Sequence, residues 1–121
     1  MKAQLSKVDD VVVVNLSGRI NMEYTGPFRD ACLKDIAQRA NKIVFDLRDL
    51  NFVGSNGIMP FVRTLNDLAN KHQKELRFCQ VGSEFQKVFA ASPLAGIQIF
   101  ESQDHAIASL RGLDFIEDEN A

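Results

Sequence analysis

Four consecutive valines, Val11, Val12, Val13 and Val14, constrain the fold of this chain more than any other feature of its sequence. Branching at the β-carbon stiffens the valine side chain and favours extended backbone. Because a run of valines offers no polar side chain to solvent, it is typical of a strand buried on both faces. The sequence therefore predicts a strand over residues 11–16 in the middle of a sheet.

Shorter apolar runs predict the other strands. Asp9 and Asp10 favour a turn, because short acidic side chains bond to neighbouring backbone groups, and an opening hairpin follows from this. The predicted strands cover residues 4–8, 11–16, 43–47, 76–81 and 97–100.

Apolar residues at helical spacing predict four helices. The clearest pattern lies between Ile58 and His72, and Pro60 must lie near the start of that helix because a later proline would break a hydrogen bond. The predicted helices cover residues 24–40, 58–72, 84–91 and 102–110.

Strands that alternate with helices predict an α/β fold. We expect one domain over residues 1–111, with a mixed, mostly parallel sheet of four to five strands and four helices. Residues 112–121 form an acidic C-terminal tail that carries Asp114, Glu117, Asp118 and Glu119.

Composition argues against several classes of function. The net charge is −2 and no block of lysine or arginine occurs, so nucleic-acid binding has no electrostatic support. No apolar stretch is long enough for a membrane span, and the N-terminus lacks the apolar core of a signal peptide, so we expect a cytoplasmic protein. Cys32 and Cys79 are expected to be reduced and partly buried, and with His72 and His105 they show no zinc spacing. We expect no metal and no catalytic residues.

Function in open α/β sheets gathers at the carboxyl ends of the strands. Residues 17–21 follow one predicted strand. Asp46 lies near the end of the next predicted strand, and residues 52–57 come after it. Ser55 and Asn56 immediately precede the clearest helix, where backbone N–H groups and the helix dipole favour negative charge.

Three segments carry a resemblance to a known family. The segment IVFDLRDLNFVGSNGIMPFV resembles the STAS signature, an apolar strand followed by Asp-Leu and a loop that ends in Asp-Ser-Ser-Gly before a helix. VVVVNLSGRIN resembles the second strand of that family, and LAGIQIFESQDHAIASL its closing strand and helix. The three segments are distributed along nearly all of residues 4–110, and the chain is similar to the anti-sigma factor antagonists.

The resemblance implies a protein that binds other proteins in signal transduction and transcription regulation, and not an enzyme. Ser55 matches the serine that is phosphorylated in regulated members, and Gly57 matches the signature glycine. The dephosphorylated form would bind a kinase/anti-sigma partner and the phosphate would release it. The partner would supply ATP and Mg²⁺, and the chain itself would need no cofactor. The family pattern has aspartate, serine and aspartate where this chain has Gly54, Asn56 and Asn21.

We therefore expect a binding face made of the loop 19–24, the loop 54–57 and the exposed side of the helix 58–72. Asp46 is expected to support the loop that holds Ser55. The candidate partner-binding residues are Arg19, Asn21, Met22, Tyr24, Gly54, Ser55, Asn56, Gly57 and Met59.

Three alternatives stay open at this point. Ser55 has a plain structural role as a helix cap, which is a common position for serine. The chain also fits an unphosphorylated STAS subunit docked on a transport ATPase or another signalling complex. A small nucleotide-binding protein is less favoured, because no phosphate-binding loop is present. The partner and the oligomeric state are left open by the sequence.

Overall fold

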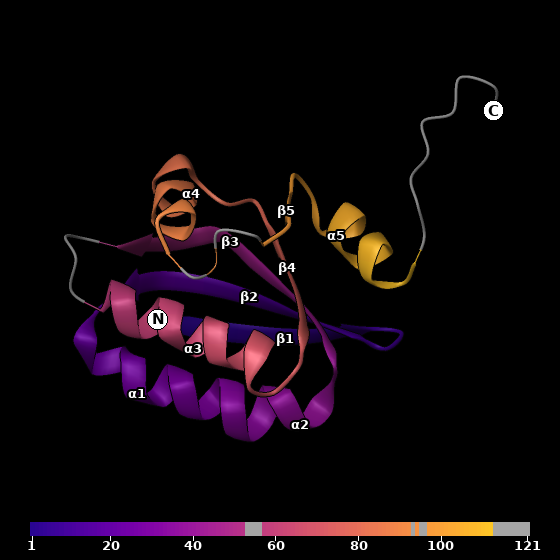
Figure 1. Cartoon of the computed structure of the whole chain (residues 1–121), viewed down its shortest axis with the longest axis horizontal. Helices are drawn as coiled ribbons and strands as arrows, with labels where there is room; N and C mark the ends of the chain where they lie inside the picture. Colours follow the sequence, from indigo (N-terminus) through magenta and orange to yellow (C-terminus); the bar gives the residue numbers. More distant parts are fainter. Residues whose placement is uncertain (53–56, 93, 95–96, 113–121) are drawn as a thin grey trace.

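The computed structural model describes residues 1–52, 57–92, 94 and 97–112, which form one sheet with helices packed against it (Figure 1). The five strands lie in the order β1-β2-β3-β4-β5. β1 (Lys2–Val8) pairs antiparallel with β2 (Val11–Ile20), and all the later pairs are parallel. The later strands are β3 (Lys42–Phe52), β4 (Glu75–Cys79) and β5 (Ile99–Phe100). The predicted mixed, mostly parallel sheet is confirmed.

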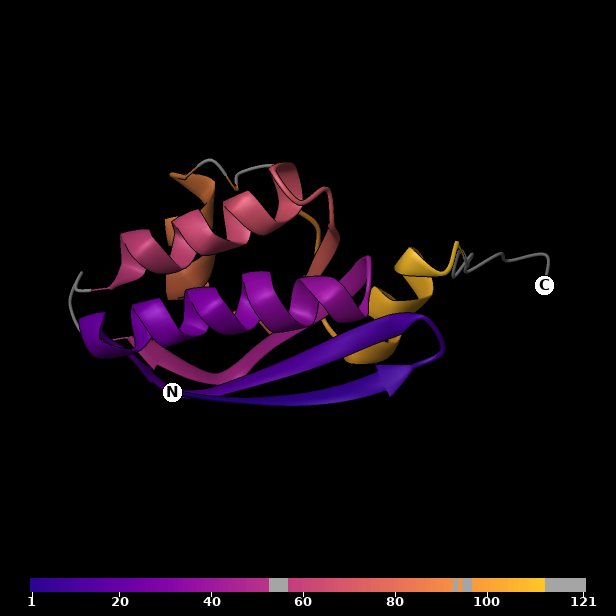
Figure 2. The same ribbon diagram turned by 90° about the horizontal axis from the view of Figure 1, so that it is seen from below.

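The helices connect these strands in the predicted order. α1 (Met22–Asp30), a π-helical stretch (Ala31–Ile36) and α2 (Ala37–Arg39) follow one another without a break. α3 (Ile58–Asn70) lies beside them on the same side of the sheet, as Figure 2 shows. The remaining helices are α4 (Ser83–Ala90) and α5 (Gln103–Leu110).

The four valines lie in two different cores. Val12 and Val14 belong to the large core that the sheet forms with α1, α3 and α4. Val11 and Val13 pack on the other face against α5, whose contributions include Ala106, Ile107 and Leu110. Because successive side chains of a strand point to opposite faces, a run of four valines fills both cores at once. The predicted burial on both faces is confirmed.

The ends of β2 and β3 differ from the prediction. β2 continues to Ile20 and β3 to Phe52, so the predicted strand ends at residues 16 and 47 are wrong. In this second part of the pair, β2 reads Ser-Gly-Arg-Ile and β3 reads Asp-Leu-Asn-Phe, and the pairing runs from Ser17 opposite Asp49 to Ile20 opposite Phe52. Cross-strand pairing stabilises these polar stretches as strand, and a single sequence does not display that pairing. Both strands therefore end side by side, at Ile20 and Phe52.

Candidate functional site

The two segments that the sequence marks as functional begin side by side. Ile20 and Phe52 are paired at the ends of β2 and β3, and Asn21 and residue 53 come next in the chain. Because parallel strands present their carboxyl ends at the same edge, the loop after β2 and the loop after β3 start next to each other. The two segments therefore leave the sheet next to each other. The predicted loop 19–24 is wrong, because Arg19 belongs to β2 and Met22 and Tyr24 belong to α1, so that only Asn21 lies between the two elements.

Gly57 brings the two loops into backbone contact. It precedes α3 with a φ of +85°, a conformation that L-residues with a side chain rarely adopt. A β-carbon at this position would lie 2.9 Å from the carbonyl carbon of Asn21 and 3.1 Å from its oxygen. Glycine is thus required at position 57 both by the backbone conformation and by the close approach to Asn21.

Asn21 is the N-cap of α1. Its Oδ1 accepts a hydrogen bond from the backbone N–H of Glu23 at 3.0 Å, and its carbonyl oxygen accepts from the N–H of Tyr24 at 3.2 Å. An aspartate here would cap the helix equally well but would add a negative charge beside Gly57. The asparagine keeps the cap and removes that charge.

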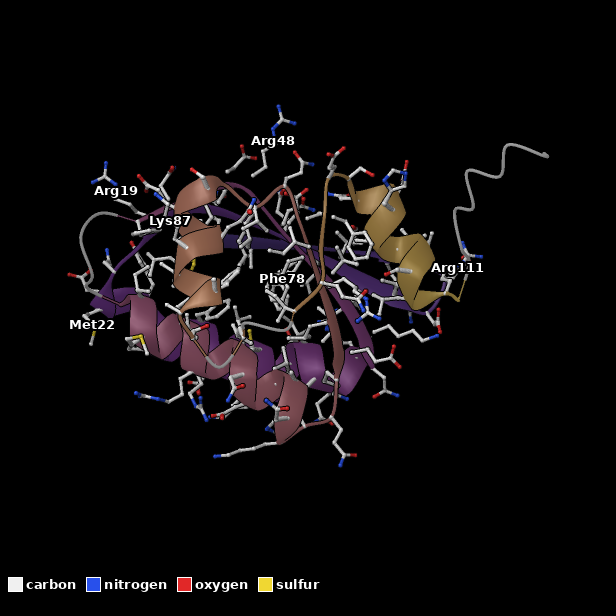
Figure 3. All side chains as sticks on the ribbon, turned by 45° about the horizontal axis from the view of Figure 1, so that its top comes forward. Arg19, Met22, Arg48, Phe78, Lys87 and Arg111 are labelled. Carbon is white, nitrogen blue, oxygen red and sulfur yellow. The ribbon has the colours of Figure 1, made fainter. Side chains whose placement is uncertain are left out.

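Exposed apolar side chains surround this contact. Met22 and Met59 have 58% and 53% of their surface exposed, and Tyr24 is also exposed. They belong to the first turns of α1 and α3, which start on either side of the contact between Asn21 and Gly57. Figure 3 shows Met22 and Arg19 at the same end of the molecule, far from Arg111. We call Arg19, Met22, Tyr24 and Met59 the loop-end patch.

The other residues of the predicted binding loop lie outside the described residues. These are Val53, Gly54, Ser55 and Asn56. Phosphorylation of Ser55, its alternative role as a helix cap, and the partner-binding roles of Gly54 and Asn56 stay predictions.

Asp46 is a buried carboxylate in the middle of β3, with 5% of its surface exposed. Its Oδ2 accepts hydrogen bonds from the side-chain amides of Gln103 in α5 at 2.7 Å and of Gln80 at 3.2 Å. Gln103 also donates to Asn15 Oδ1 of β2 at 2.9 Å. A buried carboxylate is tolerated when donors satisfy its oxygens, and this arrangement joins β2, β3 and the residue that follows β4 to α5.

The second oxygen of Asp46 stabilises a β-bulge. Asn15 lies opposite Asp46, but Ser17 lies opposite Asp49, so β3 contains one extra residue between these pairs. Asp46 Oδ1 accepts from the backbone N–H of Arg48 at 2.9 Å, within the extra segment. A bulge redirects the strand beyond it. The expected support of the loop 53–56 by Asp46 stays a prediction, and this bulge is the route through which Asp46 could act on that loop.

Sequence reasoning missed Gln80 and Gln103. A polar residue in an apolar strand signals that some buried donor must exist, because unpaired buried carboxylates are costly. Nothing in the sequence identifies the donors, since Gln80 and Gln103 lie 34 and 57 residues from Asp46.

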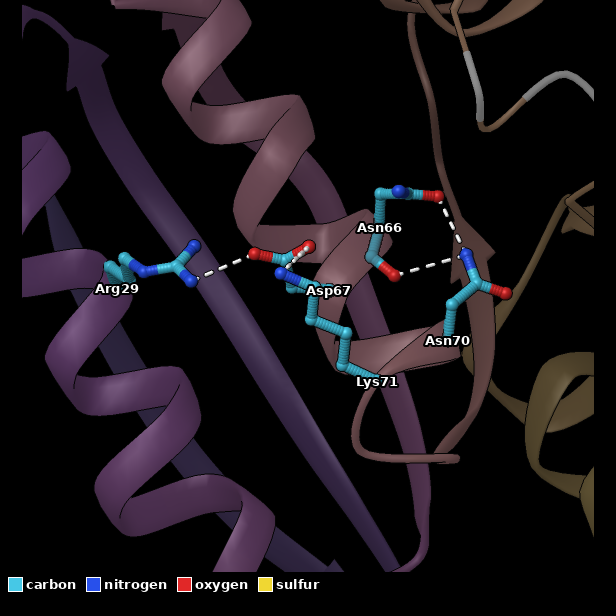
Figure 4. A network of polar contacts seen from close by, with 5 residues as sticks. All are labelled: Arg29, Asn66, Asp67, Asn70 and Lys71. Carbon is cyan, nitrogen blue, oxygen red and sulfur yellow. Dashed lines mark hydrogen bonds and ion pairs between the residues drawn. The ribbon is translucent and has the colours of Figure 1, made fainter.

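A polar network joins α1 to the last turns of α3 (Figure 4). Arg29 Nη2 lies 2.7 Å from Asp67 Oδ2, and Lys71 Nζ lies 3.8 Å from Asp67 Oδ1. The hydrogen bond from Arg29 holds the pKa of Asp67 below its usual value. This ion pair joins the two helices whose first turns carry Met22 and Met59.

The two cysteines are buried free thiols, as expected. Burial raises the pKa of both Cys32 and Cys79 to about 12, and the nearby Asp46 carboxylate adds to the rise at Cys79. Both are therefore protonated at neutral pH, which suits packing and not nucleophilic chemistry.

Within the described ranges, histidine, cysteine, aspartate and glutamate form no group that could hold a metal ion. None of the helices in the same part of the chain has the length and apolar character required to cross a membrane.

Comparisons with known proteins support this description. A sequence model of the STAS domain matches residues 2–106. Among solved structures, the phosphorylated form of the Bacillus cell-fate determinant SpoIIAA is 21% identical, with a TM-score of 0.68, and the match covers 91% of this chain and 100% of that one. No curated protein gives a significant match to the sequence.

Two further solved structures are similar. An anti-sigma factor antagonist from Mycobacterium paratuberculosis is 22% identical with a TM-score of 0.71, and the match covers 91% of this chain and 93% of that one. A variant of RsbS from Moorella thermoacetica is 16% identical with a TM-score of 0.73, and the match covers 93% of this chain and 97% of that one. At these identities the likeness establishes the fold.

Proposed function

The chain belongs to the STAS domain family, and from this we propose that it is a non-enzymatic regulator of the anti-sigma factor antagonist type, which exchanges protein partners. The proposal draws on the family and on the proteins whose fold the chain shares, one of which is an anti-sigma factor antagonist. The partner class is a kinase/anti-sigma protein, and the signalling output is control of transcription.

The observation that carries this proposal is the loop-end patch. Exposed methionine and aromatic side chains are enriched in protein interfaces, where they fill pockets of the partner. Here Met22 and Tyr24 lie in the first turn of α1 and Met59 in the first turn of α3, next to the close backbone approach of Asn21 and Gly57. An interface of exposed apolar side chains gains free energy when a partner covers them.

Phosphorylation of Ser55 would switch this surface off. Ser55 precedes Gly57 by two residues, so its α-carbon lies at most about 7.6 Å from that of Gly57. A phosphate there adds about −1.5 to −2 charges. In the free protein the start of α3 tolerates this charge, but within an interface an unpaired anion costs several kcal/mol. A micromolar complex is stabilised by only about 8 kcal/mol, so a penalty of several kcal/mol would dissociate it.

A second function is favoured by Gly54, Asn56 and Asn21, which all lack the acidic or hydroxyl group of the family pattern. A chain with fewer acids around Ser55 offers a kinase less to recognise. In this alternative the protein is an unphosphorylated STAS subunit that stays docked on a larger complex, such as a transport ATPase or a signalling assembly.

A pull-down from native lysate separates the two functions. The baits are the wild type, Ser55→Ala and Ser55→Asp, with Ser83→Ala on the exposed start of α4 as a matched control. A kinase-like partner that is retained by Ser55→Ala and lost with Ser55→Asp supports partner switching. One partner recovered equally by every bait contradicts the switch and favours the permanent complex.

A further inference from the structure

Among the described residues, β1 is an edge strand of the sheet and pairs only with β2. β1 is the outermost strand on one side of the sheet, and all seven of its residues are exposed. Its pairing with β2 is regular from Lys2 opposite Ser17 to Val8 opposite Val11. In an antiparallel pair, alternate residues direct their N–H and C=O groups away from the partner, so half of the β1 backbone is available for another strand.

The side chains of this edge define which strand would fit. Leu5 and Val8 are exposed, and Leu5 borders a shallow groove of about 270 Å³ that Lys7, Val12 and Arg39 also line. In the described part of the chain, Lys2 and Lys7 form no ion pair. A second copy of β1 would bring more lysines and no acids, and like charges on paired strands repel. The edge therefore fits a strand that is both acidic and apolar.

We propose that the chain's own C-terminal segment, residues 113–119, adds to β1 as an antiparallel sixth strand. These residues lie beyond the described part of the chain, and their sequence reads Leu-Asp-Phe-Ile-Glu-Asp-Glu. It combines three apolar residues with four acids, which matches the apolar and basic character of the β1 edge.

The segment starts at the correct end of β1. Arg111, just after α5, has its Nη2 atom 3.0 Å from Asp9 Oδ2, in the turn that joins β1 to β2. Gly112 has a φ of +71°, which lets the chain leave the helix in a new direction. Figure 2 shows the end of α5 beside the tip of this hairpin. A chain that leaves here and runs back along β1 is antiparallel to it.

The length and order of the residues also match. Seven extended residues span about 24 Å, as β1 itself does. If Leu113 lies opposite Val8, then Asp114 lies opposite Lys7, Ile116 opposite Leu5 and Glu119 opposite Lys2. Each lysine of β1 then faces an acid, and Leu5 and Val8 each face an apolar side chain. A shift that places Leu113 opposite Lys7 removes the acid from that lysine.

Amide hydrogen exchange measured by NMR tests the proposal. The full chain is compared with a chain that ends at Gly112, at several protein concentrations. We expect the β1 amides that point away from β2 to exchange more slowly in the full chain, by about tenfold if the segment is bound nine-tenths of the time. Amides of β3 and β4 serve as the internal reference. Unchanged exchange in β1 on truncation overturns the proposal, and so does protection that rises with protein concentration, which would assign the edge to a second copy.

Charge-reversal substitutions test the proposed register between residues 113–119 and β1. The double substitution Lys2→Glu and Lys7→Glu should remove the protection as truncation does, and adding Asp114→Lys and Glu119→Lys should restore it. Lys87→Glu on the exposed surface of α4 is the matched control and should change nothing. The proposed strand pairing is contradicted if the β1 amides stay protected after the two lysine substitutions. It is also contradicted if the two added acid-to-lysine substitutions do not restore the protection.

Discussion

Substitution of Gly57 by alanine tests the contact on which the loop-end patch depends. The left-handed conformation of this residue costs an L-residue roughly 1–2 kcal/mol. The new methyl group would also meet the backbone of Asn21 at 2.9 Å, and overpacking of this kind costs about 1–3 kcal/mol. Because backbone moves less readily than a flexible side chain, we expect both penalties to apply. Gly57→Ala should lower the free energy of unfolding by about 2–5 kcal/mol.

The assay is urea unfolding of the variant beside the wild type, with the midpoint and slope fitted separately. Gly26→Ala is the matched control, since Gly26 lies within α1 and a β-carbon there meets nothing within 4 Å. Alanine is the better helix former, so this control should stabilise the protein by about 0.5–1 kcal/mol. A Gly57→Ala protein within about 0.5 kcal/mol of the wild type, with unchanged NMR shifts at Asn21, would refute the reasoning.

Three further predictions concern the interior. Asp46→Ala leaves buried amide donors such as that of Gln103 without an acceptor, so it should lower the free energy of unfolding in urea by about 1–3 kcal/mol. It should also speed hydrogen exchange more in α5 than in β4. Equal effects on both elements would contradict a specific link to α5. Because the folded-state pKa of Asp67 is lowered, its contribution is present at neutral pH and is lost as the pH falls below its usual value of 3.8. Asp67→Asn should therefore cost about 1 kcal/mol or less at pH 7 and show a weaker loss of stability on acidification, and parallel pH curves would contradict this. Cys32 and Cys79, with pKa values raised to about 12, should resist a thiol reagent at pH 8 until urea unfolds the chain, whereas rapid labelling of the native protein would contradict their burial.

The order of the elements could be read from the sequence because its signals are local. Helical spacing between Ile58 and Leu68 and the run of β-branched valines each reflect a repeat of the backbone, so they predict α3 and β2 without knowledge of the rest. The ends of β2 and β3 could not be read in this way. The residue types at Ser17, Gly18 and Asn51 are typical of loops. These residues adopt extended structure because they pair with the neighbouring strand.

The loops of the candidate site were located by motif and resemblance, but the reasons for their residues lie in the tertiary structure. The family pattern predicted glycine at position 57. The structure shows why glycine is required there, because the backbone of Asn21, which is far from Gly57 in the sequence, leaves no room for a β-carbon. Asp46 was expected to serve the loop, and the described structure shows it bonded to Gln80, Gln103 and the bulge at Arg48.

The sequence by itself determined the class of fold and the family, and it predicted the strand ends at which the candidate site lies. These depend on backbone periodicity and on short contiguous motifs, which each segment carries within itself. The tertiary structure decided which strands continue past their apolar runs, which donors satisfy Asp46, and how Asn21 and Gly57 meet. Those features depend on contacts between distant segments, and such contacts exist only once the sheet brings its strands together.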